Sequence, residues 1–118
     1  MRQPPTTAVE APSFIRDSAS LLTDEERDEL IAYVATNPEA GAVMPGTGGV
    51  RKIRWAGRGR GKRGGMRVIY YYGGRALPVF LLNVFAKNEK VDLSQSEKNE
   101  MKAWIPRLVA AYGRRLAR

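Results

Sequence analysis

The stretch VRKIRWAGRGRGKRGGMRVIYYYGGRALPVFLLNVFA, residues 50–86, governs the architecture of this chain. It holds three runs with strand character, residues 50–56, 66–72 and 79–86, which are rich in β-branched, aromatic and other apolar residues. A glycine-rich basic loop joins the first two runs, and Gly73-Gly74 predicts a tight turn into the third. Because the third run is almost wholly apolar, we expect it to be a central strand covered on at least one face.

The part of the chain before these runs predicts a tail and one or two helices. Residues 1–12 hold three prolines and form either a short edge strand or a tail; we treat them as a flexible segment. Thr23 and Glu26 have the spacing of a capping box, and the apolar positions that follow predict a helix that Asn37-Pro38 ends. Residues just before Thr23 could belong to a preceding helix, and residues 13–118 are expected to form a single domain.

A second capping-box spacing, Ser94 with Glu97, follows the strand runs. An apolar stripe then predicts a C-terminal helix, which Pro106 must kink or restart because proline lacks a backbone donor. The order of elements predicts an α+β domain. We expect a small antiparallel sheet of three to four strands, with an N-terminal helix (or two) and the C-terminal helix packed on one side.

Composition excludes several classes of enzyme. The 118 residues include no cysteine and no histidine, which removes disulfides, cysteine metal sites, histidine triads and paired-histidine ribonucleases. We therefore expect no metal site and no cofactor. No apolar run approaches the roughly 20 residues of a membrane span, and no signal peptide is evident, so a cytoplasmic protein without a membrane partner is expected.

Charge is segregated along the chain, whose net charge is +8. Residues 1–39 hold eight acids and three bases, whereas residues 40–88 hold ten bases and no acid. A block of one sign is typical of a surface that binds phosphate groups. The alternative is a basic loop that only keeps the protein soluble. Four of these bases lie in the loop between the first two strand runs and are candidate RNA contacts: Arg58, Arg60, Lys62 and Arg63.

Alternation in the first strand places Lys52 and Arg54 on one face and Arg51, Ile53 and Trp55 on the other. If Ile53 and Trp55 pack against helices, two cations about 7 Å apart project together from the opposite face and repel each other unless an anion lies between them. The alternative is an exposed sheet face that is simply charged. Arg51 is a further candidate RNA contact.

Three further candidates could converge on the same surface. Arg67 opens the second strand, while Lys87 and Glu89 follow the third, with Asn88 between them as an RNA contact. Glu89 could be a general base for a ribose hydroxyl, could orient a neighbouring cation, or could simply begin a solvated loop. Without histidine, RNA cleavage can use the RNA's own 2′-hydroxyl as nucleophile, with lysine and arginine stabilising the phosphorane and a lysine removing the proton.

The tyrosine block supplies candidate base contacts. Alternation sends Tyr70 and Tyr72 to one face and Tyr71 to the other. An exposed tyrosine could stack on an unpaired RNA base, so Tyr70 and Tyr72 are candidates, although core packing is the alternative for each.

Three blocks resemble the RelE superfamily of bacterial toxins, most closely its HigB-type branch. They are PGTGGVRKIRW (residues 45–55), GGMRVIYY (residues 64–71) and FAKNE (residues 85–89). The resemblance implies a RelE-like fold. It also implies a metal-independent endoribonuclease that enters the ribosome, cleaves mRNA and arrests growth.

The resemblance further implies partners and site residues. The partners are the ribosome, mRNA and a cognate antitoxin of helix-turn-helix type. The toxin would contact operator DNA only through its complex with this antitoxin. Carried over by motif, the catalytic residues are Lys52, Arg54, Arg67, Lys87 and Glu89. Some relatives have an arginine where Asn88 stands and a base-stacking tyrosine shortly after, which is absent between Asp92 and Ser96.

Two other functions remain open at this point. A ParE-type toxin of the same fold inhibits DNA gyrase without nuclease chemistry, and it would not need the clustered cations. A non-catalytic RNA-binding or ribosome-binding protein would use the basic loop only for phosphate contacts, with affinity that falls steeply with salt.

Overall fold

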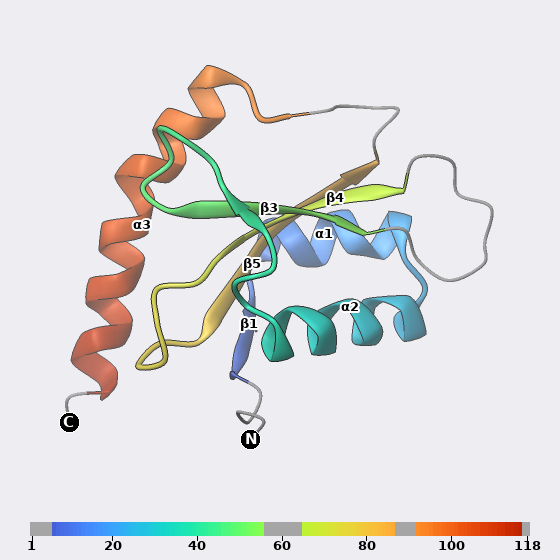
Figure 1. Cartoon of the computed structure of the whole chain (residues 1–118), viewed down its shortest axis with the longest axis horizontal. Helices are drawn as coiled ribbons and strands as arrows, with labels where there is room; N and C mark the ends of the chain where they lie inside the picture. Colours follow the sequence, from blue (N-terminus) through green and yellow to red (C-terminus); the bar gives the residue numbers. More distant parts are fainter. Residues whose placement is uncertain (1–5, 56–64, 87–91, 117–118) are drawn as a thin grey trace.

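The computed structural model describes residues 6–55, 65–86 and 92–116. Their elements follow one another along the chain as β1 (Ala8–Glu10), α1 (Pro12–Leu21), α2 (Asp24–Thr36), β2 (Ala42–Val43), β3 (Val50–Trp55), β4 (Met66–Tyr71), β5 (Val79–Ala86) and α3 (Gln95–Leu116) (Figure 1). The α+β class is confirmed, as are the three strands expected between residues 50 and 86 and the helices expected on either side of them.

The described strands form one five-stranded mixed sheet in the order β1-β5-β4-β3-β2. The pairs from β2 to β5 are antiparallel, whereas β1 lies parallel to β5 with Ala8 opposite Val79. The expectation of three to four antiparallel strands was therefore wrong, because β1 has three residues and β2 has two, too few to show alternation. Within the segment expected to be flexible, residues 8–10 form an edge strand instead.

The helices cover both faces of the sheet, not one as the sequence suggested. Phe14 of α1 with Leu30 and Val34 of α2 packs on one face, against a buried cluster that includes Val68. Ile105 of α3 packs on the other face, in a second buried cluster with other strand residues. In Figure 1 α3 stands apart from α1 and α2, with the strands between them. The prediction failed because amphipathic patterning shows that a helix has an apolar side but not which sheet face it covers.

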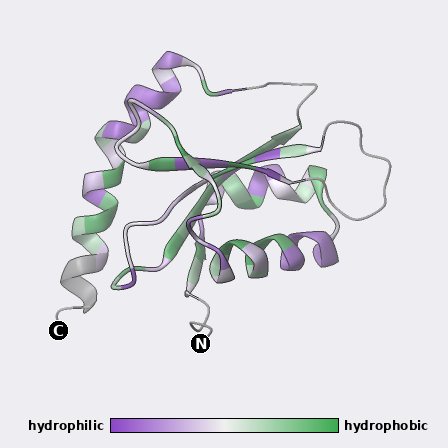
Figure 2. Ribbon diagram, viewed as in Figure 1, coloured by the Kyte–Doolittle hydropathy of each residue, from purple (hydrophilic) through white to green (hydrophobic). Residues whose placement is uncertain are grey.

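Alternation explains how one strand serves both clusters. In β4, Met66, Val68 and Tyr70 belong to the cluster under α1 and α2, whereas Ile69 belongs to the cluster under α3. β5 is buried on both faces, as its nearly continuous apolar sequence predicted. Figure 2 shows this apolar colouring along β5 and polar colouring at the acidic start of α2.

The two capping boxes form as predicted. At α2 the Glu26 N–H donates to Thr23 Oγ1 over 3.1 Å, and the Thr23 N–H donates to Glu26 Oε1 over 2.9 Å. Ser94 and Glu97 make the same reciprocal pair at the start of α3. α3 continues through Pro106, so proline neither ends nor restarts the helix.

Beyond the end of β1, side chains of α1 form hydrogen bonds with backbone groups at the edge of β5. Ser13 Oγ donates to the Leu82 carbonyl over 2.6 Å, and Asp17 Oδ2 accepts from the Val84 N–H over 3.4 Å. Asn83 Nδ2 also donates to Asp17 Oδ2. Because Ser13 and Asp17 lie one turn apart on α1, the helix takes the place of a neighbouring strand along this edge.

Candidate phosphate-binding face

Three cations from two neighbouring strands lie on the sheet face that α3 partly covers. Arg54 of β3 pairs directly with Arg67 of β4, and Lys52 pairs with Ile69, which is buried in the cluster under α3. Arg54 is exposed, while Lys52 and Arg67 are half-buried. We call Lys52, Arg54 and Arg67 the cation face.

The other side of β3 explains why these cations point where they do. Ile53 and Trp55 pack against the cluster under α1 and α2, and the Trp55 ring lies 5.4 Å from the ring of Tyr33 on α2. Burying these two apolar side chains turns Lys52 and Arg54 to the opposite face. This part of the sequence prediction is confirmed.

The register of β3 and β4 sets two like charges directly opposite each other. Like charges directly opposite each other on neighbouring strands destabilise a sheet, and Arg54 and Arg67 form such a pair. The next pair along the ladder, Trp55 with Met66, marks the end of β3 and the start of β4, and Ala86, opposite Met66, ends β5. The cation face therefore lies at the end of the sheet where three strand termini meet.

Asp92 contacts the cation face and was missed as a site residue. Its Oδ1 lies 3.4 Å from Lys52 Nζ, and its Oδ2 lies 3.6 Å from Lys98 Nζ on α3. Burial opposes ionisation of the carboxyl, but the Leu93 N–H and the charges of Lys52 and Lys98 outweigh it and lower the pKa of Asp92. In the sequence Asp92 resembles an ordinary loop acid that follows Glu89, and no local pattern indicates its role.

Arg51 does not belong to this face. It lies on the opposite side of β3, where Nη1 donates to the Gly41 carbonyl over 2.7 Å and to the Glu39 carbonyl over 3.2 Å. The guanidinium thus holds the segment before β2 against β3. This structural role is one that a basic residue in a charge block can equally have, and contact of Arg51 with RNA stays a prediction.

Tyr70 and Tyr72 also lie on the wrong face for RNA bound at the cations. Tyr70 is fully buried, and its hydroxyl accepts from the Gly41 N–H over 2.8 Å and donates to the Pro38 carbonyl over 2.9 Å. Burial raises the pKa of Tyr70 above its ordinary value of 10.0. Tyr72 packs against the same cluster under α1 and α2. Tyr70 is therefore a core residue and not a base-stacking one, whereas base stacking by the half-buried Tyr72 stays a prediction.

Tyr71, which the sequence analysis did not select, shares a face with the cations but stacks on Phe80 with ring centroids 6.5 Å apart. The other predicted residues lie outside the described part of the chain. They are Arg58, Arg60, Lys62, Arg63, Lys87, Asn88 and Glu89.

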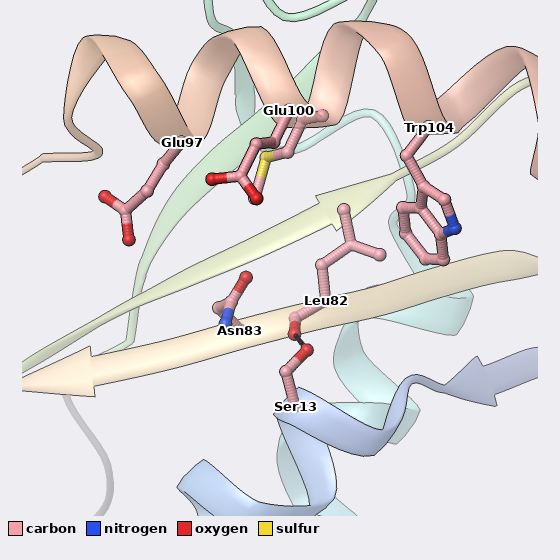
Figure 3. Close-up of a pocket in the computed structure, with 7 residues that line it drawn as sticks. Ser13, Leu82, Asn83, Glu97, Glu100 and Trp104 are labelled. Carbon is pink, nitrogen blue, oxygen red and sulfur yellow. Dashed lines mark hydrogen bonds between the residues drawn. The ribbon is translucent and has the colours of Figure 1, made fainter.

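A separate hollow lies between α3 and the edge of β5 (Figure 3). Glu97, Glu100 and Trp104 of α3 extend toward Leu82 and Asn83 of β5, with Ser13 of α1 below. Among the residues that the structure describes, its lining contains two carboxylates and no lysine or arginine. It is therefore unsuited to phosphate binding and distinct from the cation face.

The described residues contain no group of three or more His, Cys, Asp and Glu that could hold a metal ion. In the same part of the chain, no helix combines the length and apolar character needed to cross a membrane.

A comparison with protein families places this geometry in context. A family model described as "RelE toxin of RelE / RelB toxin-antitoxin system" matches residues 22–118, which is more than half of the chain. The matched range includes all three residues of the cation face as well as Asp92 and α3.

Proposed function

The chain belongs to the RelE toxin family, and on this basis and that of the cation face we propose that it is a ribosome-dependent endoribonuclease that cleaves mRNA. Family membership makes it a toxin of a toxin–antitoxin system with an antitoxin as partner. The ribosome, the mRNA substrate, a helix-turn-helix antitoxin and a cytoplasmic site of action are part of the proposal.

The pairing of Arg54 with Arg67 carries the proposal. Arg54 and Arg67 stand directly opposite each other, and Lys52 lies two residues before Arg54 on β3. These three positive charges favour the binding of an anion on this face. A phosphodiester supplies such an anion, and its charge increases as the phosphorane forms. In the proposed reaction the three cations stabilise the transition state more than the ground state.

In the proposed reaction the RNA 2′-hydroxyl oxygen attacks the adjacent phosphorus and loses its proton to a base. The bond from phosphorus to the 5′-oxygen breaks, and that oxygen takes up a proton. The products are a 2′,3′-cyclic phosphate and a 5′-hydroxyl. Lys87 and Glu89, which the family resemblance implies as catalytic residues, remain part of the proposal by resemblance alone.

Growth arrest and mRNA 5′-end mapping test the function together. Expression without the antitoxin should stop growth and produce cuts phased with ribosomes within minutes. Lys52→Ala and Arg67→Ala should each lower the cleavage rate by about 10²–10³ and relieve growth arrest, while antitoxin binding persists. Arg75→Ala is the matched control, because it removes an exposed arginine from the turn between β4 and β5.

Each rival function gives a different result. A gyrase inhibitor would cause DNA damage without cuts in RNA. A non-catalytic RNA-binding protein would slow translation without new 5′ ends. Full toxicity of both cation-face variants would refute the assignment of these residues even if mRNA is cut.

A further inference from the structure

Asp92 connects the sheet to α3 through two lysines. Its two carboxylate oxygens face different partners: Oδ1 faces Lys52 on β3, and Oδ2 faces Lys98 on α3. The Leu93 N–H donates to Oδ1 over 2.7 Å, so the carboxylate is also held by the backbone at the start of the helix. Lys98 thereby lies next to a residue of the cation face, although it comes from another element.

These ion pairs contribute little to the stability of the fold. The N–O distances of 3.4 Å and 3.6 Å exceed those of strong charge-assisted hydrogen bonds, which are about 2.7–2.9 Å. The Asp92 side chain is 43% exposed, and exposed ion pairs are typically worth about 0–1 kcal/mol. The burial of Leu93 and Ile105 already attaches α3 to the sheet. Asp92 therefore adds little to the stability of the fold, and its main effect is on the two lysine side chains that it contacts.

Asp92 limits where the two lysine side chains can point. A lysine has many rotamers, and ordering its side chain on substrate binding costs up to about 2 kcal/mol. One N–H of each ammonium directed at Asp92 leaves the others for a phosphate oxygen. Because the side chains of Lys52 and Lys98 are only 29% and 22% exposed, part of this ordering is complete before RNA binds.

We propose that Asp92 is a positioning residue that aligns Lys52 for phosphate contact and brings Lys98 of α3 to the same phosphate-binding surface. The inference rests on the proposed ribonuclease function. It adds a helix-borne cation to the three on the sheet and makes the junction before α3 part of the active site.

The test compares Asp92→Asn and Asp92→Glu with the wild-type chain on ribosomes programmed with mRNA. We expect Asp92→Asn to lower kcat about tenfold to hundredfold, because Lys52 loses its alignment. Its binding to ribosomes that carry a 2′-deoxy mRNA, which cannot be cut, should be unchanged or tighter, because a negative charge near phosphate is removed. Asp92→Glu keeps the charge and should restore part of kcat.

Three outcomes would overturn the positioning role. Equal or faster cleavage by Asp92→Asn would make the carboxylate a competitor of the phosphate. Parallel losses of cleavage, binding and melting temperature would make Asp92 a structural residue. If Asp92→Glu has a kcat no higher than that of Asp92→Asn, the alignment of Lys52 does not depend on the charge at this position.

Lys98 is tested against a matched lysine on the same helix. Lys98→Ala should raise KM or lower kcat severalfold, whereas Lys102→Ala removes the same charge one turn further along α3 and should have no such effect. Equal effects of the two variants would overturn the assignment of Lys98. If the wild-type chain does not cleave ribosome-bound mRNA, the proposed function itself fails, and this result is separate from any difference among the variants.

Discussion

The hydroxyl of Tyr70 offers a direct test of whether this tyrosine serves the fold or the substrate. Tyr70→Phe removes one oxygen, which accepts from the Gly41 N–H over 2.8 Å and donates to the Pro38 carbonyl over 2.9 Å. Gly41 is buried, so its N–H loses its hydrogen-bond partner in the variant. A buried donor left without a partner costs about 1–3 kcal/mol, and the half-buried Pro38 carbonyl can turn to water.

We therefore expect Tyr70→Phe to lower the free energy of unfolding by about 2 kcal/mol. For a chain of 118 residues the unfolding entropy is about 0.25 kcal/mol/K, so the melting temperature should fall by about 8 °C. Urea unfolding followed by tryptophan fluorescence measures the free energy. Tyr33→Phe is the matched control, because Tyr33 is 39% exposed and its change should cost less than about 0.5 kcal/mol.

Activity decides between the two roles of Tyr70. If the hydroxyl serves the fold, the variant should cleave mRNA at the wild-type rate at temperatures well below its melting point. Unchanged stability together with a large loss of cleavage would refute the reasoning and return Tyr70 to the RNA-binding surface.

Three further predictions concern stability. Thr23→Ala breaks the capping box of α2 and should cost about 1 kcal/mol in urea unfolding, and a cost near zero would show that Glu26 alone caps the helix. Asp17→Ala leaves the Val84 N–H at the β5 edge without its acceptor and should cost about 1–3 kcal/mol, whereas Asp17→Asn should cost less because it keeps a carbonyl oxygen; equal costs would contradict this role. Because folding raises the pKa of Tyr70, its contribution to stability is present below pH 10.0 and should be lost as pH rises through the folded-state pKa; alkaline unfolding that is the same in Tyr70→Phe would contradict this.

Local patterns in the sequence were sufficient for the long elements. Capping boxes at Thr23 and Ser94 and the apolar run of β5 predicted elements that the structure contains. The two short edge strands were not predictable, because they depend on pairing with distant strands and not on their own two or three residues. The placement of α3 on the second face likewise depends on tertiary packing.

The sequence predicted only those parts of the candidate site that follow from the alternation of side chains along a strand. Period-two patterning correctly placed Lys52 and Arg54 opposite Ile53 and Trp55. It also placed Tyr70 and Tyr72 together, but it could not tell that their face is the one under α1 and α2. The contact of Asp92 with Lys52 joins a helix start to a strand forty residues earlier in the sequence, and no local pattern indicates it.

The parallel pairing of β1 with β5 has a consequence for how the chain is made. β1 is synthesised well before its partner β5, because α1, α2 and three other strands lie between them in the chain, and Ser13 must likewise wait for Leu82, 69 residues later. Contacts of such high sequence separation are closed late in folding, since the entropy of the long loop must be overcome first. The nascent chain therefore cannot complete its sheet until β5 has emerged, although β3 and β4, which bear the cation face, pair directly with each other.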